Sequence, residues 1–543
     1  MKLDVVTKTL AAAAAALLVA GCGGGGGDAA LNVSGTAATG AALANADVRV
    51  KCAEGDGTAT TNASGGYTVS VGNGKLPCLV QVSGTTAAGA SVTLHSIADT
   101  ADANGEATAN VTPVTEMIVA YLLAAIPSQA FDAFDPQQVT PAAVTQAATA
   151  IVTALKDAGV DLTGIDPLKA DLVPAVNGSG GNAYDQLLDN LGKTVGPESL
   201  PLVVNQIATA AAAGGSAAGL TTAMAAVAGG SLEGCPVALS GKYRAIDYNG
   251  ALQNITLDFK AMTIAVEGES GTLPVTRSST QACEVKVDTS TIVFGPGGVG
   301  AIHAADVIGY LVPVQPHTLA SIAGAWTFLE SGLDENNLIM HFMGKFTIAA
   351  DGKTSLCEYD LANFSTCTPD VDESVQALAD GGFKVVNDDN MDTRFYGFRA
   401  PNGEITLFGT NNPSNSWALG DYKTHWVMTK APKAAVPDVG HVQKFWQLRV
   451  SAFNGSDLVT APLVSDSSTI TASDAAAGTF TRQQASNGQV DSWQVNHPVD
   501  GMRHRAGAGS VSEMHQLLLP GLGMSAFLVG SSAKSYGILV TQP

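Results

Sequence analysis

The sequence has few charged and few aromatic residues. Charged residues make up 14% of the 543 positions and aromatic residues 6%, and acidic residues outnumber basic ones by 48 to 27. The resulting net charge of −21 argues against binding to nucleic acid or an anionic surface, because such binding depends on clustered Lys and Arg. We therefore expect no nucleic-acid partner.

Motifs for catalysis or metal binding are also missing. The chain has no Gly-x-Ser-x-Gly elbow, no His-Glu-x-x-His and no Cys-x-x-Cys. Residues 295–300 match the glycine spacing of a dinucleotide site, but Pro296 removes a backbone N–H and the flanking residues predict strands. We expect a hairpin loop there and no cofactor.

The start of the chain predicts export. The apolar run from Leu10 to Ala20 is too short to span a bilayer, which needs roughly twenty residues, so it predicts a signal peptide. It ends in Leu18-Val19-Ala20-Gly21-Cys22, which resembles the bacterial lipobox. The resemblance implies that residues 1–22 are a lipoprotein signal peptide and that acylated Cys22 contacts membrane lipid.

A glycine-rich tether follows at residues 23–30, which would hold a folded domain away from the membrane. Gly23 stands where an aspartate marks inner-membrane retention in Gram-negative lipoproteins. The resemblance therefore implies an outer-membrane anchor, on either the periplasmic or the cell-surface face.

Six further cysteines remain, and an even number in an exported protein predicts disulfides. Pairing each cysteine with its neighbour is one of fifteen connectivities, and it keeps each bond within one segment. The expected pairs are Cys52 with Cys78, Cys235 with Cys283, and Cys357 with Cys367.

The pattern of apolar residues divides the chain into regions and predicts a multidomain, mainly β protein. Residues 31–98 alternate like strands and include Asn45-Ala46-Asp47-Val48-Arg49-Val50 and Thr60-Thr61-Asn62-Ala63-Ser64-Gly65-Gly66-Tyr67. These residues resemble the carboxypeptidase regulatory-like domain, which implies a small non-catalytic β-sandwich.

The period becomes helical over residues 112–230, where Thr112-Pro113 and Thr140-Pro141 predict helix starts, so we expect a central helical bundle. Residues 235–435 and 440–543 again alternate like strands. We expect two related β modules in the first range and one in the second, built as barrels, sandwiches or propeller-like sheets. Similar openings occur at Gly241-Lys242-Tyr243 and Gly324-Ala325-Trp326, with a looser one at Lys444-Phe445-Trp446.

Signals for a binding site are weak. Trp417 follows a polar stretch and is a candidate for ligand contact, because exposed aromatic rings stack on sugars or polymers. Asp388, Asp389 and Asp392 form an acidic loop that could hold surface Ca²⁺. His497, His504 and His515 lie near Arg503 and Arg505. Metal binding is one hypothesis for this cluster, and the favoured one is a solvated loop with histidines at the edge of the core.

Together these features favour a membrane-anchored extracytoplasmic lipoprotein that acts by binding, adhesion or a structural role in the envelope over an enzyme. The expected partner is a polysaccharide or an envelope protein. The alternative is an extracytoplasmic hydrolase with an unrecognised active site in the C-terminal β region.

Overall fold

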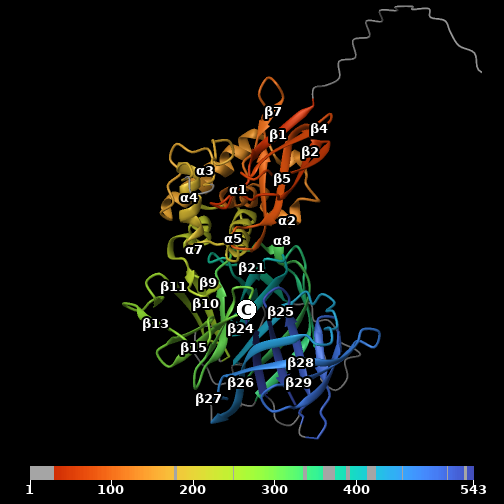
Figure 1. Ribbon diagram of the computed structural model, residues 1–543. Coiled ribbons are helices and arrows are strands. Elements are labelled where there is room, and N and C mark those ends of the chain that lie inside the picture. The colour runs from red at the N-terminus through yellow and green to blue at the C-terminus, as the bar shows by residue number, and fades with distance from the viewer. Residues whose placement is uncertain are drawn as a thin grey trace, which may run out of the picture.

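The computed structural model describes the chain from residue 30, with internal gaps (Figure 1). The described ranges are 30–175, 180–248, 250–333, 339–358, 373–386, 392–411, 423–454, 457–509, 511–530 and 535–543. Strands dominate and form several separate sheets, which confirms the predicted multidomain, mainly β class. In these ranges, no helix combines the length and apolar character needed to cross a membrane.

Seven N-terminal strands form two sheets, with the orders β4-β1-β7 and β3-β2-β5-β6. In β4, Tyr67, Val69 and Val71 are buried and alternate with more exposed residues, because successive side chains of a strand point to opposite faces. A disulfide joins Cys52 and Cys78, which lie directly opposite each other on two paired strands. The strands are β1 (Leu31–Thr36), β2 (Asp47–Glu54), β3 (Asp56–Thr60), β4 (Gly66–Val71), β5 (Lys75–Thr85), β6 (Ser91–Ala98) and β7 (Glu106–Thr108).

The helices follow in the next part of the chain. Thr112 and Thr140 each accept a hydrogen bond from a backbone N–H of the first turn, and a proline occupies the first helical position, as the sequence predicts. The helices are α1 (Pro113–Leu123), α2 (Pro127–Ala130), the 3₁₀-helix η1 (Pro136–Gln138), α3 (Pro141–Asp157), α4 (Ala183–Gly192), α5 (Leu200–Ala212), α6 (Ala217–Ala223) and α7 (Ala225–Gly229).

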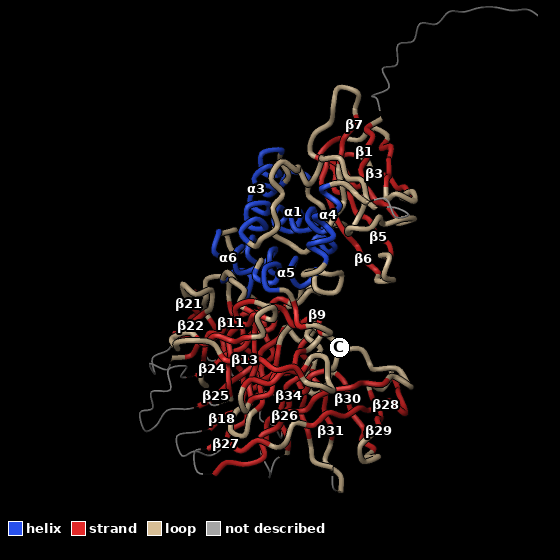
Figure 2. Tube along the Cα trace, turned by 60° about the vertical axis from the view of Figure 1, so that its left-hand side comes forward, coloured by secondary structure: helices blue, strands red, loops and turns tan. Residues whose placement is uncertain are grey.

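The N-terminal sheets and the helices share one hydrophobic core, in which Val33 and Val80 of the sheets belong with Ile118 and Ile207 of the helices. They are also joined by a buried polar contact. Glu116 Oε2 of α1 lies 2.8 Å from His95 Nδ1 of β6 and accepts the backbone N–H of His95 at 2.5 Å. The helices therefore pack directly on the sheets (Figure 2).

The first C-terminal sheet is a closed barrel, because its last strand, β17, pairs with its first, β10. A short hairpin of β8 (Ser231–Leu232) and β9 (Cys235–Leu239) leads into it, and a disulfide joins Cys235 to Cys283. The barrel strands are β10 (Gly241–Asp247), β11 (Leu252–Asp258), β12 (Thr263–Val266), β13 (Leu273–Arg277), β14 (Glu284–Val287), β15 (Ser290–Phe294), β16 (Gly300–His303) and β17 (Ile308–Pro313).

The second sheet is nearly closed. Its edge strands are β20 and β21, and an isolated bridge joins Lys353 to Ser374 between those edges. A short helix, α8 (Leu319–Ile322), precedes it. The strands are β18 (Gly324–Leu333), β19 (Ile339–Ile348), β20 (Thr354–Glu358), β21 (Ser374–Ala377), β22 (Phe383–Val386), β23 (Thr393–Arg399), β24 (Ile405–Asn411) and β25 (Lys423–Thr429).

The third sheet closes into a barrel because β26 pairs with both β28 and β34. The three openings noted in the sequence each lie in the first strand of one of these sheets. The strand pairings show that, of the three expected architectures, the sheets are barrels. The strands are β26 (Val442–Asn454), β27 (Asp457–Thr460), β28 (Val464–Asp474), β29 (Thr479–Gln484), β30 (Val490–Val495), β31 (Met502–Arg505), β32 (Met514–Leu519), β33 (Met524–Val529) and β34 (Ser535–Thr541).

The three barrels meet in one shared hydrophobic core, which contains a buried polar cluster. The hydroxyls of Tyr310 in the first barrel and Tyr536 in the third are 2.7 Å apart. Tyr248, just after β10, is 2.7 Å from the hydroxyl of Ser331 in the second barrel. The His425 ring of the second barrel packs edge-on against Tyr536 at 4.3 Å between centroids. These contacts fix the barrels against one another.

Candidate functional site

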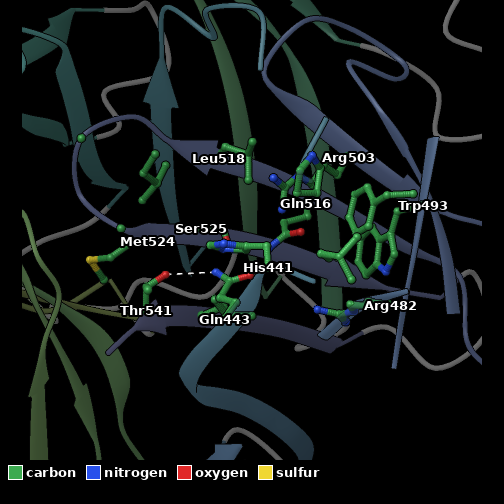
Figure 3. Close-up of a pocket in the computed structure, with 17 residues that line it drawn as sticks. His441, Gln443, Arg482, Trp493, Arg503, Gln516, Leu518, Met524, Ser525 and Thr541 are labelled. Carbon is green, nitrogen blue, oxygen red and sulfur yellow. Dashed lines mark hydrogen bonds between the residues drawn. The ribbon is translucent and has the colours of Figure 1, made fainter. Parts of the chain in front are cut away.

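The third barrel holds a partly enclosed cavity of about 280 Å³ (Figure 3). Every strand of its closed ring, β26 and β28 to β34, contributes at least one lining residue. Aromatic and aliphatic side chains form part of the wall, and no acidic residue occurs among the described lining residues. The polar part of the lining consists of Gln443, Arg482, Arg503, Gln516, Ser525 and Thr541, with His441 beside them.

Strand alternation directs the polar groups inward. In β31, Arg503 and Arg505 share the inner face, whereas Met502 belongs to the core shared with the other barrels. In the neighbouring β32, Gln516 lines the cavity and Leu517 packs into the shared core. The barrel therefore places polar and charged residues inside and uses its apolar outer face to contact its neighbours.

One buried carboxylate neutralises part of this interior. Asp491 accepts hydrogen bonds from Arg482 Nε at 2.9 Å, Arg505 Nη1 at 2.7 Å and Trp493 Nε1 at 2.8 Å. Burial alone would raise the pKa of Asp491, but the charge of Arg482 and these hydrogen bonds outweigh it, so the pKa is lowered. Asp491 is thus a fixed anion between two guanidinium groups.

Arg503 has no such counter-ion in the part of the chain that the structure describes. Its Nε is buried without a hydrogen-bond partner among the described residues. Burial, and then the charge of Arg482, lower the pKa of Arg503 to about 10. Three inner guanidiniums and one carboxylate leave the barrel interior with an excess of positive charge, although the whole protein carries a net charge of −21. An anion entering the cavity would therefore be stabilised.

Aromatic rings hold the arginines in place. The Arg503 guanidinium lies 5.3 Å from the centroid of Phe480, the Phe480 and Trp493 rings are nearly parallel at 6.3 Å, and Arg482 lies 4.8 Å from the centroid of Trp493. Each cation is within the distance at which a ring face attracts it. This stack gives the cavity a flat apolar wall with a cation at each end.

The second barrel contains another cavity, of about 330 Å³, with a more apolar lining. Phe328, Phe342 and Trp426 contribute rings, and two carboxylates, Glu330 and Glu373, also line it. Glu330 Oε1 accepts hydrogen bonds from Thr424 Oγ1 at 2.5 Å and from Asn411 Nδ2 at 3.3 Å. This site can enclose an apolar group next to an anchored carboxylate.

Of the residues singled out in the sequence, Cys22, Cys367, Trp417, Asp388 and Asp389 lie outside the described residues. Their expected roles stay predictions.

Two predicted disulfides are confirmed, Cys52–Cys78 and Cys235–Cys283. Cys357 is also disulfide-bonded. Asp392 lies in ion pairs with Arg394 at 2.9 Å and Lys384 at 3.7 Å. The calcium site expected at this loop stays a prediction, because Asp388 and Asp389 lie outside the described residues.

The histidine and arginine segment near the C-terminus differs from the expectation. A solvated loop with histidines at the edge of the core is expected there. His515 is buried and His504 half-buried, as expected, but Arg503 to Arg505 belong to β31 and His515 to β32. Residues 502–505 give no strand signal, because three polar residues follow Met502 and arginine is rarely an inward-facing residue. Arg482 and Asp491 carried no local signal, since their contact depends on strand pairing.

No family model matches the sequence, and no curated protein is detectably related to it. The solved structures that match this chain have low overall similarity to it. A protein of unknown function from the DUF3598 family of Nostoc punctiforme has 9% identity and a TM-score of 0.15, covering 41% of this chain and 97% of that one. Kievitone hydratase from Nectria haematococca has 10% identity and a TM-score of 0.16, covering 42% and 90%. Transferrin binding protein B from serogroup B Neisseria meningitidis has 9% identity and a TM-score of 0.17, covering 54% and 65%. At these TM-scores the likenesses carry no functional argument.

Proposed function

We propose that this chain is a lipid-anchored envelope protein that binds a small anionic ligand with an apolar body in its third barrel. The observation that carries the proposal is Arg503, which has no counter-ion among the described residues and faces a cavity whose described lining contains no acidic residue. Burying an unpaired charge is costly, and a bound carboxylate or phosphate would supply the missing partner. The rings of Phe480 and Trp493 would contact the apolar part of the ligand.

The cavity volume narrows the ligand class. About 280 Å³ lies at the lower end of the range for small-molecule sites. An aromatic or short-chain carboxylate fits this space, whereas a polysaccharide chain could place only an acidic terminal group there. Gln443, Gln516 and Ser525 would give further hydrogen bonds to its polar atoms.

Calorimetric titration with two matched probe pairs tests this proposal: benzoate against benzamide, and indole-3-acetate against indole-3-acetamide. We expect the carboxylates to bind and the amides to bind at least about tenfold more weakly, because only the anion pairs with Arg503. Arg503→Gln should abolish this preference without lowering the unfolding temperature, since it removes an unpaired buried charge. Arg449→Gln, at an exposed arginine of the same barrel, is the control. Equal binding of acid and amide would refute the proposal.

The proposed membrane address is supported by the lipobox-like residues ending at Cys22 and by Gly23 after it. They suggest an outer-membrane anchor, with the N-terminal sheets as a carboxypeptidase regulatory-like module. Mass spectrometry of the N-terminal peptide tests the anchor: we expect an acylated Cys22, and an unmodified or absent residue 22 would contradict it. Protease shaving of intact cells then distinguishes the cell surface from the periplasm.

A second candidate function is hydrolysis in the second barrel, which the pair of carboxylates Glu330 and Glu373 favours. Glycoside hydrolysis uses two carboxyl groups on either side of the scissile bond. A panel of nitrophenyl glycosides tests it. Activity that is lost in Glu330→Gln and kept in Glu198→Gln, at an exposed glutamate outside the barrels, would support an enzyme.

A further inference from the structure

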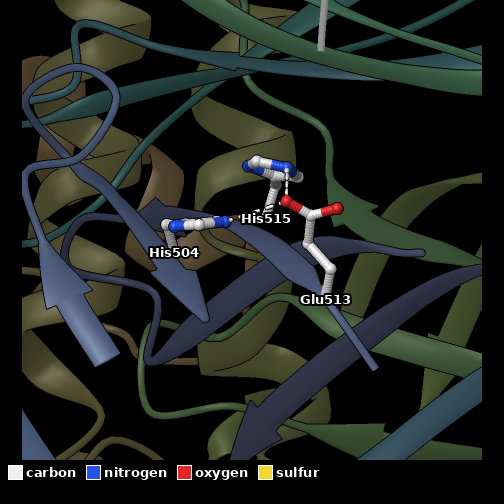
Figure 4. Close-up of side chains that lie close together, drawn as sticks. All are labelled: His504, Glu513 and His515. Atoms are coloured by element: carbon white, nitrogen blue, oxygen red, sulfur yellow. Dashed lines mark hydrogen bonds and ion pairs between the residues drawn. The ribbon is translucent and has the colours of Figure 1, made fainter. Parts of the chain in front are cut away.

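The third barrel carries a second group of polar side chains near the β31–β32 strand pair (Figure 4). His504, Glu513 and His515 offer one ligand atom each, and these atoms lie within 4.8 Å of one another. Glu513 Oε1 is 3.1 Å from His504 Nε2 and 3.6 Å from His515 Nε2. A single carboxylate oxygen therefore faces both imidazoles.

The backbone sets up this arrangement. His504 in β31 and His515 in β32 are direct partners in the antiparallel register, and their rings stack at 4.7 Å between centroids. Glu513 lies just before β32, two positions ahead of His515, and its carboxylate lies 3.6 Å from the His515 ring nitrogen. The carbonyl of Glu513 accepts the backbone N–H of Gly530 at 2.8 Å, which ties this residue to the end of the next strand. The three groups are thus held before any ligand arrives.

Two imidazole nitrogens and one carboxylate oxygen are a donor set that zinc prefers. Bonds of about 2.0–2.2 Å at tetrahedral angles place neighbouring ligand atoms roughly 3.3–3.6 Å apart. The two measured separations from Glu513 Oε1 are close to this range. We propose that His504, Glu513 and His515 bind a divalent transition-metal ion of the zinc class, with the fourth position open.

His497 is the nearest further imidazole, with its ring centroid 5.3 Å from that of His504. It lies in the loop between β30 and β31, so a small movement of this loop could bring it to the fourth position. The metal would join β31 to β32 on the face opposite Arg503 and Gln516, whose side chains point into the cavity. The site does not depend on the anion proposed for that cavity.

The test uses the full mature chain, Co²⁺ as a spectroscopic probe and Zn²⁺ in competition with a chromophoric chelator. We expect one equivalent of Co²⁺ to give the visible absorption of a tetrahedral or five-coordinate site, and Zn²⁺ to displace it. Glu513→Gln and His504→Gln should each weaken Zn²⁺ binding by at least about tenfold. Loss of a residue that only hydrogen-bonds to a metal ligand typically lowers metal affinity by about 10–100-fold, and loss of a ligand itself should cost more. Glu198→Gln, at an exposed glutamate of the helical region, should bind like the wild type.

Thermal unfolding without metal checks that each variant is folded. Arg503→Gln should keep the full metal affinity, which separates failure of this site from failure of the anion cavity. The proposal is overturned if the wild-type chain shows no stoichiometric Co²⁺ spectrum, or if the two ligand variants bind Zn²⁺ as tightly as the wild type.

Discussion

Single charged residues inside the third barrel have opposite roles. Asp491 is saturated by hydrogen bonds from two arginines and a tryptophan, so it organises the interior. Arg503, two residues from Arg505 on the same strand face, has a buried Nε without a partner in the described structure. A buried network in which every polar group has a hydrogen-bond partner makes the structure rigid, whereas a buried polar group without a partner can be stabilised by a bound ligand.

Asp491→Asn should strongly destabilise the third barrel. The substitution leaves Arg482 and Arg505 buried without a countercharge, and breaking a buried ion pair in this way costs about 3–5 kcal/mol. Calorimetric unfolding at pH 7.5 measures the loss. Asp500→Asn, at an exposed aspartate of the same barrel, should change stability by less than about 0.5 kcal/mol.

Asp491 also makes the stability of the third barrel depend on pH at the acidic end. Because the fold lowers the pKa of Asp491, its stabilisation is complete above about pH 4 and declines as the pH falls through the lowered folded value. The Asp491→Asn variant should therefore not show this part of the loss of stability on acidification. An Asp491→Asn barrel as stable as the wild type at pH 7.5 would show that the ion triad contributes little.

At the scale of elements, local patterns sufficed for helices and most strands. Thr112-Pro113 and Thr140-Pro141 start helices where expected because capping and proline act within one turn. Barrel closure could not be predicted, because it depends on pairs such as Phe445 with Thr541 at opposite ends of a sheet. The cavity was missed for the same reason: its wall combines eight strands, and each contributes only one to three residues.

Loops between strands also join the barrels. The loop between β15 and β16 is the hairpin loop that Pro296 and the flanking strand pattern predict. It docks on the third barrel, where Gly297 donates its N–H to the Leu522 carbonyl at 3.2 Å. A Cβ at Gly297 would lie 2.6 Å from both the Gly521 carbonyl oxygen and Leu522 Cα. Gly297 therefore allows a close approach between the first and third barrels.

Gly297→Ala should weaken contact between the first and third barrels. The added methyl group meets backbone that cannot rotate away, and overpacking of this kind costs about 1–3 kcal/mol. Differential scanning calorimetry should show a lower unfolding temperature, or a third-barrel transition that separates from the rest. Gly72→Ala provides the control, because no atom lies within 4 Å of the added Cβ. Equal unfolding curves for the two variants would contradict the proposed close contact.

At the scale of the whole molecule, the described chain has a large shared core in each half. The N-terminal sheets and helices share one, and the three barrels share another. Asn205 of α5 donates a hydrogen bond to the Arg399 carbonyl of the second barrel and so connects the halves. The alternation of apolar residues predicted the β-rich class, but it could not show that barrels pack through apolar outer faces, since burial on both faces removes the usual alternation.

This packing buries histidines, which makes stability depend on pH. Burial lowers the pKa of His425 to about 3, and burial with the charge of Arg399 lowers the pKa of His317 to about 3. In the unfolded chain each imidazole titrates near pH 6.5. Below that pH the unfolded state therefore binds protons that the folded state cannot, and stability falls by about 1.4 kcal/mol per pH unit for each histidine.

The unfolding temperature should therefore be nearly constant from pH 8 to 7 and fall steeply below about pH 6. His425 lies among Tyr248, Tyr310 and Tyr536 at the junction of the barrels, so its protonation should separate them. His425→Gln should be less stable at pH 7.5 but lose stability more gradually on acidification, because one proton-binding group has been removed. If the slopes of His425→Gln and the wild type are parallel between pH 6.5 and 4.5, the acid sensitivity does not arise at the barrel junction.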